Sequence, residues 1–133
     1  MESSHAREAP QQRLDEAKVH LFSADGFISA LRSESEYLKN HHTGITLMKT
    51  NELRVLLVAA EAGATLESHV VRGPATMFVI EGMLEIETQE RVYRAGRGDL
   101  IVLPRDEPRR IACSEHSSFL LALAPSAAAV PAT

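Results

Sequence analysis

Two short segments of this chain carry side chains that can do chemistry at alternating positions. In the segment TLESHVV, Glu67 and His69 are two residues apart, and in the segment RRIAC, Arg109 and Cys113 are four residues apart. Residues at such spacings share one face of a β-strand. Two strands would therefore present a carboxylate with an imidazole on one face, and a guanidinium with a thiol on another.

These groups are compatible with two kinds of metal-free chemistry. Arg109 and His69 can form an anion receptor, because a guanidinium offers a planar pair of donors to a carboxylate or phosphate and an imidazole adds one more hydrogen bond. His69 can also act as a general base if a carboxylate orients it and a proton donor lies across the substrate. Glu67 and Tyr93 are the local candidates for those two roles.

A metal centre is disfavoured by the number of donors. Iron, manganese or zinc is typically held by three or four nitrogen, oxygen or sulfur ligands, and His69 supplies one. A cation at Arg109 would also repel a divalent ion. The remaining donors have no supporting spacing, namely Glu67, Cys113, His41 and His42. We therefore predict neither a metal nor another cofactor.

Two spacing frames surround these residues. The segment GATLESHVVRGPATMFVIEG follows the frame GX5HXHX3EX6G at Gly63, His69 and Gly82. The second histidine position of this frame holds Val71, and the glutamate position holds Ala75. Two positions of the frame that usually carry metal donors therefore carry hydrocarbon side chains here.

The second frame, GX5PXGX2H, follows about fifteen residues later in GDLIVLPRDEPRR. Gly98 and Pro104 match it, while Asp106 and Arg109 stand at the glycine and histidine positions. Both frames in this order resemble the cupin superfamily, and more closely its small single-domain bacterial members, over residues 44–124. The resemblance implies an all-β fold, a cupin-type double-stranded β-helix or jelly-roll barrel, in which only one of the four usual ligands survives. It implies no particular activity, since one fold hosts many functions.

The resemblance also implies which side chains face the interior. It turns Arg109 and Cys113 inward, and on the strand TMFVIE it turns Met77 inward and Phe78 outward. An apolar cavity with a few polar groups is the usual composition of a small-molecule site. The predicted ligand-binding residues are His69, Arg109, Met77, Cys113 and Glu67.

The outward face of the strand TMFVIE is unusually apolar. Phe78 and Ile80 would both be exposed to solvent in an isolated barrel. Either the segment ahead of the barrel covers them, or a second copy does, since symmetric dimers are the commonest oligomers. Cupins of this kind are often dimers, and we therefore predict a homodimer.

The rest of the chain consists of short apolar runs separated by turn residues. From Gly44 onward, nine such runs with short connectors predict antiparallel strands. Ahead of them, KVHLF is compatible with a short strand, and SADGFISALRSE with a capped helix. We predict a flexible arm over 1–16, a strand and helix packing on the barrel over 17–43, the barrel over 44–124, and a flexible tail over 125–133.

Composition restricts the partners. A chain of 133 residues is large enough for one core. Eighteen acidic against 14 basic residues offer no electrostatic footprint for nucleic acid or an anionic membrane. One cysteine forms no internal disulfide, the first residues lack the apolar run of a signal peptide, and no stretch approaches the roughly 20 apolar residues that span a bilayer. These features predict a cytoplasmic protein without nucleic-acid or membrane partners.

The leading hypothesis is a metal-free barrel that binds or senses a small, acidic molecule, for example a carboxylate, without catalysis of its own. One alternative is a metal-dependent oxygenase or isomerase with non-standard ligands around His69. Another is a purely structural or partner-binding dimer. The residue pattern does not name the ligand.

Overall fold

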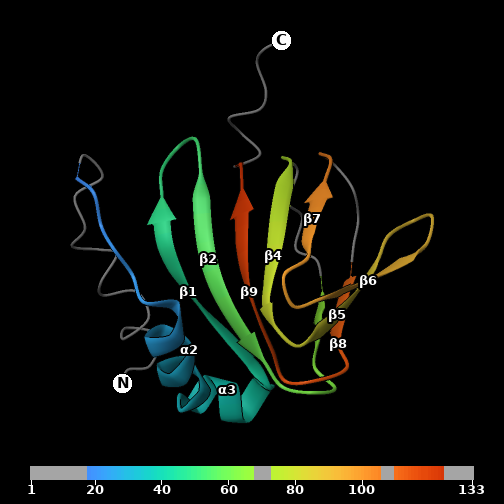
Figure 1. Cartoon of the computed structure of the whole chain (residues 1–133), viewed down its shortest axis with the longest axis horizontal. Coiled ribbons are helices and arrows are strands. Elements are labelled where there is room, and N and C mark those ends of the chain that lie inside the picture. Colours follow the sequence, from blue (N-terminus) through green and yellow to red (C-terminus); the bar gives the residue numbers. More distant parts are fainter. Residues whose placement is uncertain (1–17, 68–72, 106–109, 125–133) are drawn as a thin grey trace.

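The chain forms two antiparallel β-sheets that face each other, with two helices on the outside of one sheet (Figure 1). The computed structural model describes residues 18–67, 73–105 and 110–124. The five-stranded sheet has the order β1 (His42–Lys49), β2 (Arg54–Ala60), β9 (Ser117–Leu123), β4 (Ala75–Glu81), β7 (Leu100–Leu103). The four-stranded sheet has the order β3 (Thr65–Glu67), β8 (Arg110–Cys113), β5 (Met83–Glu87), β6 (Val92–Gly96). The predicted all-β jelly-roll barrel is confirmed.

The space between the sheets is filled by apolar side chains. Strand alternation brings Met77 and Val79 from β4, Leu84 and Ile86 from β5, and Phe119 from β9 into one cluster, each at most 1% exposed. The same alternation turns the neighbours of these residues outward, as predicted for the strand TMFVIE. Interior side chains pack at crystal-like density, so this cluster holds the two sheets together.

Helix α2 (Ala24–Arg32) lies on the outer face of the five-stranded sheet. Ser23 caps it, because its hydroxyl oxygen accepts a hydrogen bond from the backbone nitrogen of Gly26 at 3.2 Å. Ile28 and Leu31 are buried in a second cluster with Leu57 of β2. The predicted capped helix is confirmed, and no helix among the described residues is long and apolar enough to cross a membrane.

A second helix, α3 (Ser35–Asn40), was not predicted from the sequence. It has six residues, and its buried Tyr37 joins the same cluster as α2. His41 ends it in the left-handed conformation, with φ of 71°. Strand β1 then begins at His42, two residues before the predicted start of the barrel. So short a helix depends on tertiary contacts, because isolated helices of this length are unstable in water.

The strand predicted for KVHLF is not formed. Residues 19–23 have no regular secondary structure, and Val19 and Leu21 are 96% and 97% exposed. Phe22 alone makes a ring contact with the helix, with its centroid 5.6 Å from that of Phe27. A β-prone sequence becomes a strand only where a neighbouring strand pairs with its backbone, and no described strand does so here.

The turn between β4 and β5 requires a glycine. Gly82 has φ of 92°, and a Cβ atom there would overlap the hydroxyl of Ser117 and the carbonyl of His116. That hydroxyl also accepts a hydrogen bond from the backbone nitrogen of Met83 at 3.1 Å, so it is held in place. Gly63 has a similar φ of 90°, but open space surrounds the position of its Cβ.

The substitution Gly82→Ala should destabilise the fold more than Gly63→Ala. Both changes force alanine into a left-handed conformation, which costs roughly 1–2 kcal/mol. The first adds a steric overlap with backbone and should bring the loss to at least about 3 kcal/mol. Urea unfolding of the two variants measures the difference, and equal losses would contradict the role assigned to the contact with β9.

Candidate functional site

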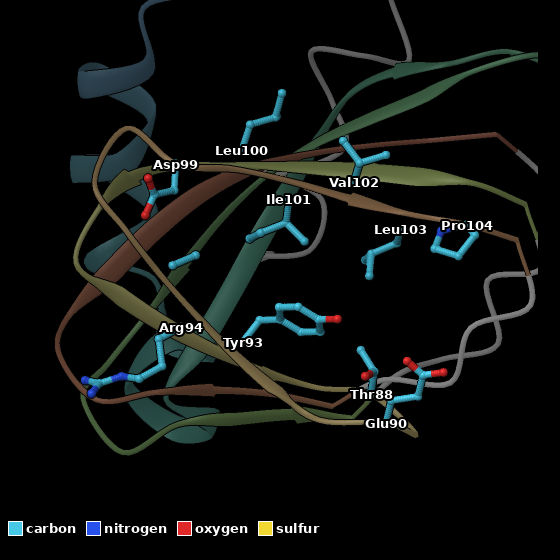
Figure 2. Close-up of a pocket in the computed structure, with 11 residues that line it drawn as sticks. Thr88, Glu90, Tyr93, Arg94, Asp99, Leu100, Ile101, Val102, Leu103 and Pro104 are labelled. Carbon is cyan, nitrogen blue, oxygen red and sulfur yellow. The ribbon is translucent and has the colours of Figure 1, made fainter.

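The two sheets separate between their edge strands, β6 and β7, and leave a cleft of about 620 Å³ (Figure 2). Small-molecule sites commonly have volumes of roughly 300–1,000 Å³. The cleft is lined by Thr88, Glu90, Tyr93, Arg94, Ala95, Asp99, Leu100, Ile101, Val102, Leu103 and Pro104.

Strand alternation divides the residues of β7 between two surfaces. Figure 2 shows Ile101 and Leu103 directed into the cleft, while Leu100 and Val102 point away from it. Leu103 is 4% exposed and belongs to the core between the sheets, and Ile101 packs against that core. The floor of the cleft is therefore the edge of the hydrophobic core.

Tyr93 of β6 faces Ile101 and Leu103 across the cleft. Tyr93 is 43% exposed, and its side chain points inward on the same face of β6 as the buried Ala95. The guanidinium carbon of Arg91 lies 5.0 Å from the ring centroid, which is a cation–π contact. No hydrogen bond joins the Tyr93 hydroxyl to another described residue, so it is available to a ligand.

Several polar groups at the cleft serve the protein itself. The carboxylate of Asp99 accepts a hydrogen bond from the Gly96 nitrogen at 2.8 Å and fixes the turn between β6 and β7. Arg94 points away from the cleft, with Nε 3.7 Å from a carboxylate oxygen of Glu85. The Thr88 hydroxyl bridges the β5–β6 turn to backbone atoms of residue 91. Tyr93 and Glu90 are then the polar lining residues that can form hydrogen bonds with a ligand.

Solved structures of the same architecture match this chain. An RmlC-like cupin from Shewanella frigidimarina has a TM-score of 0.60 at 17% identity, over 65% of this chain and 78% of that one. An uncharacterized protein with a double-stranded β-helix domain from Klebsiella pneumoniae has a TM-score of 0.67 at 22% identity, over 82% of this chain and 92% of that one. This chain has the cupin fold.

The same fold occurs in an enzyme of known activity. Salicylate 1,2-dioxygenase from Pseudoaminobacter salicylatoxidans matches with a TM-score of 0.68 at 14% identity, over 77% of this chain and 32% of that one. This chain therefore spans about a third of the dioxygenase. No protein-family model and no curated protein matches the chain. Similarity at these identities shows the fold and not the activity.

Two of the predicted ligand-binding residues lie inside the cupin barrel. Met77 is 0% and Cys113 is 2% exposed, and both belong to the core cluster between the sheets. Neither lines the cleft. Glu67 ends β3, with its backbone opposite Arg110 of β8. His69 and Arg109 lie outside the described residues, as does the side chain of Glu67, so their roles stay predictions.

The environment of Cys113 disfavours the thiolate form of its side chain. Burial raises the pKa of its thiol to about 11, and a hydrogen bond with Ser117 opposes this rise only in part. The thiol is therefore neutral at physiological pH, whereas metal coordination and nucleophilic attack both need the thiolate. Among the described residues no three His, Cys, Asp or Glu side chains are grouped so as to hold a metal ion.

The histidine pair at the start of β1 belongs to the other end of the barrel. His42 pairs with Ala60, which in turn pairs with Ser117 at the start of β9. Ala75 pairs with Leu123 at the far end of β9. The pair is therefore remote from Ala75, the first residue of β4. His41 is instead bound locally, with Nδ1 2.7 Å from a carboxylate oxygen of Glu61.

Sequence reasoning considered Tyr93 only as a proton donor and missed the cleft. The alternation of Tyr93 with the small Ala95 places both residues on the inner face of β6. That pattern is visible in the sequence. The separation of β6 from β7 is not, because it depends on the pairing of strands that are distant in the chain.

Cys113 should resist thiol reagents in the folded protein. At pH 8 we expect labelling at least about 100-fold slower than in denaturant, because the folded pKa lies well above the usual 8.5 and the thiol is buried. The chain has one cysteine, so the signal has one source. A folded-state rate close to that of the unfolded chain would contradict this and restore Cys113 as a candidate ligand.

Acidification should weaken the fold through His42. Burial, and secondarily the charge of His41, lower the pKa of His42 below its ordinary value of 6.5. A histidine with a depressed folded-state pKa stabilises the fold above its unfolded pKa, and this contribution is lost as pH falls below about 6.5. Melting temperatures from pH 8 to pH 5 should fall less for His42→Asn than for the wild type. The variant of the exposed His20, His20→Asn, is the control, and identical slopes for both variants would contradict the assignment.

Proposed function

We propose that this cupin binds a small, mostly apolar organic acid in the cleft between β6 and β7, without a metal and without catalysis of its own. The observation that carries the proposal is a cleft of about 620 Å³ in which the partly exposed Tyr93 faces the edge of the hydrophobic core. A cytoplasmic location stays a prediction from the sequence.

The apolar part of the ligand would lie between Tyr93 and the side chains of Ile101 and Leu103. A flat ring stacks on a tyrosine face, and a short aliphatic chain covers the same area. In either case the ligand removes water from apolar surface, which is the main source of affinity in such a site. The Tyr93 hydroxyl is placed to fix the orientation of the ligand by one hydrogen bond.

The acidic group would meet arginines at the border of the cleft. Arg91 already lies over the Tyr93 ring, and Arg105 directly follows Pro104, a lining residue. Glu90 opposes them with one negative charge. A guanidinium binds a carboxylate through two parallel hydrogen bonds, which favours a carboxylic acid over its neutral amide.

The lining residues support binding rather than catalysis. Among the described residues that line the cleft there is neither histidine nor cysteine, and the carboxylates are Glu90 and Asp99, of which Asp99 is engaged in a turn. General acid–base catalysis needs a titratable group within hydrogen-bond reach of the reacting atoms. A metal-dependent oxygenase or isomerase around His69 stays the alternative. Near one equivalent of metal in chelator-free protein would favour that alternative over the metal-free proposal.

Matched acids and amides test the ligand class. Benzoate with benzamide, and hexanoate with hexanamide, would be compared by thermal shift and calorimetry. We expect the acids to raise the melting temperature more than the amides. At 100 times its dissociation constant, a ligand stabilises the fold by about 2.7 kcal/mol. If neither acid nor amide has an effect at millimolar concentration, the proposal fails for this class of ligand.

Substitutions on β6 test the location. Tyr93→Ala should abolish the shift, Tyr93→Phe should retain most of it, and Val92→Ala, on the opposite face of the same strand, should leave it unchanged. Arg105→Gln should reduce the preference for the acid while sparing the amide. A shift that survives Tyr93→Ala but is lost in Arg109→Gln would place the ligand in the barrel interior instead of the cleft.

A further inference from the structure

A second cavity lies outside the barrel, between helix α2 and the outer side of the five-stranded sheet. Its volume is about 480 Å³, which is within the usual range for small-molecule sites. It is lined by Asp25, Ile28, Ser29 and Arg32 of α2, by Ile80 and Glu81 of β4, and by Arg97 of the turn between β6 and β7. We name this cavity the helix pocket. None of these seven residues lines the cleft beside Tyr93, so the two are separate sites.

The helix wall of the pocket is one face of α2. Its members are Asp25 and the residues three, four and seven positions after it, and residues at these spacings lie on the same side of a helix. Ile28 is 5% exposed and belongs to the cluster that joins α2 to the sheet, and Ile80 packs against that cluster. The two isoleucines therefore give the pocket an apolar part next to the core, whereas Asp25 and Arg97 are exposed to solvent.

Two of the four charged groups in the helix pocket neutralise each other. The Nη2 atom of Arg32 lies 3.2 Å from a carboxylate oxygen of Glu81 and donates a hydrogen bond to it. This ion pair joins the last residue of α2 to the last residue of β4. The charges that remain for a ligand are those of Asp25 and Arg97.

Asp25 and Arg97 form no ion pair with each other or with another described residue. They line the same pocket from its two walls, one from the first turn of α2 and the other from the turn between β6 and β7. A guanidinium offers a planar pair of donors that matches a carboxylate, and a carboxylate accepts hydrogen bonds from an ammonium group. The pocket therefore presents a group that binds carboxylates on one wall and a group that binds ammonium on the other.

We infer that the helix pocket binds a small zwitterion, namely an α-amino acid with an apolar side chain. The carboxylate of the ligand pairs with Arg97 and its ammonium group with Asp25. Its side chain lies against Ile28 and Ile80, where it is removed from water. The hydroxyl of Ser29, on the same face of α2, is placed to add a hydrogen bond to one of the charged groups.

The balance of charge in the helix pocket favours a zwitterion over an anion or a cation. The lining residues carry two guanidiniums and two carboxylates, so their formal charges cancel. An anion would leave Asp25 unpaired and would be repelled by both carboxylates. A cation would leave Arg97 unpaired in the same way. Removing a charge from water without pairing it costs free energy, so a ligand that carries both charges is the one that satisfies both groups.

Three forms of one amino acid test the ligand class. L-Leucine carries both charges, N-acetyl-L-leucine carries the carboxylate alone, and L-leucinamide at about pH 6.5 carries the ammonium group alone. By calorimetry we expect leucine to bind with a dissociation constant at least about tenfold below that of either derivative. Glycine should bind more weakly than leucine, because it buries no apolar side chain. No binding of leucine at about 10 mM, or equal binding of the N-acetyl form, would overturn the inference.

Substitutions on the two walls test the location. Arg97→Gln and Asp25→Asn should each raise the dissociation constant of leucine at least about tenfold. Arg97→Gln should also remove the preference for leucine over leucinamide, because the two ligands differ at the carboxylate. Asp25→Asn should remove the preference for leucine over N-acetyl-leucine, because these two differ at the ammonium group.

The matched control is Arg54→Gln, which removes an exposed arginine at the start of β2, outside the pocket. It should bind leucine as the wild type does, and all three variants should keep the circular dichroism spectrum of the wild type. Leucine binding that survives both Arg97→Gln and Asp25→Asn would overturn the inference. Binding that is lost in Tyr93→Ala but kept in Arg97→Gln would place leucine in the cleft and overturn it as well.

Discussion

The five-stranded sheet is apolar on both faces, and the rest of the structure depends on how each face is covered. The inner face, with Met77 and Val79 fully buried, is covered by the four-stranded sheet. The outer face also carries large apolar residues, and α2 with α3 covers half of it. Ile80 is shielded by that cover and Phe78 is not. The two helices therefore form only a partial second layer on the outer face of this sheet, and part of its apolar surface remains exposed.

Strand β7 separates the proposed ligand cleft from an exposed outer surface. Because side chains alternate along a strand, Ile101 and Leu103 face the cleft while Leu100 and Val102 face outward. This short edge strand is hydrogen-bonded to β4 alone among the described strands. Edge strands are the parts of a sheet that remain open to additional contacts. Ligand binding in the cleft would restrain the backbone of this edge strand.

In the part that the structure describes, the interior of this cupin-fold barrel is filled by apolar side chains and one buried thiol. Met77, Cys113 and Phe119 fill it, and the Cys113 thiol is kept neutral by burial. Val71 and Ala75 have hydrocarbon side chains at positions where the cupin frame has metal donors. These residue types agree with an apolar interior. The cleft between β6 and β7 instead combines core side chains with a tyrosine open to solvent. A shared fold with a dioxygenase is compatible with such a difference, because function depends on the site rather than on the fold.

The sequence by itself determined the strands of the barrel and the cap of α2, and its resemblance to cupins indicated which residues of β4 point inward. The strands and the cap follow from short apolar runs, short connectors and Ser23, all of which act between residues close in the chain. Only the tertiary structure decided that KVHLF forms no strand, that α3 exists, and that a cleft opens beside Tyr93. Each of these depends on distant partners: a strand to pair with residues 18–22, a sheet to bury Tyr37, and the separation of β6 from β7. Local patterns specify which conformation a segment favours, but pairing and burial between distant segments determine whether it is formed and what it adjoins.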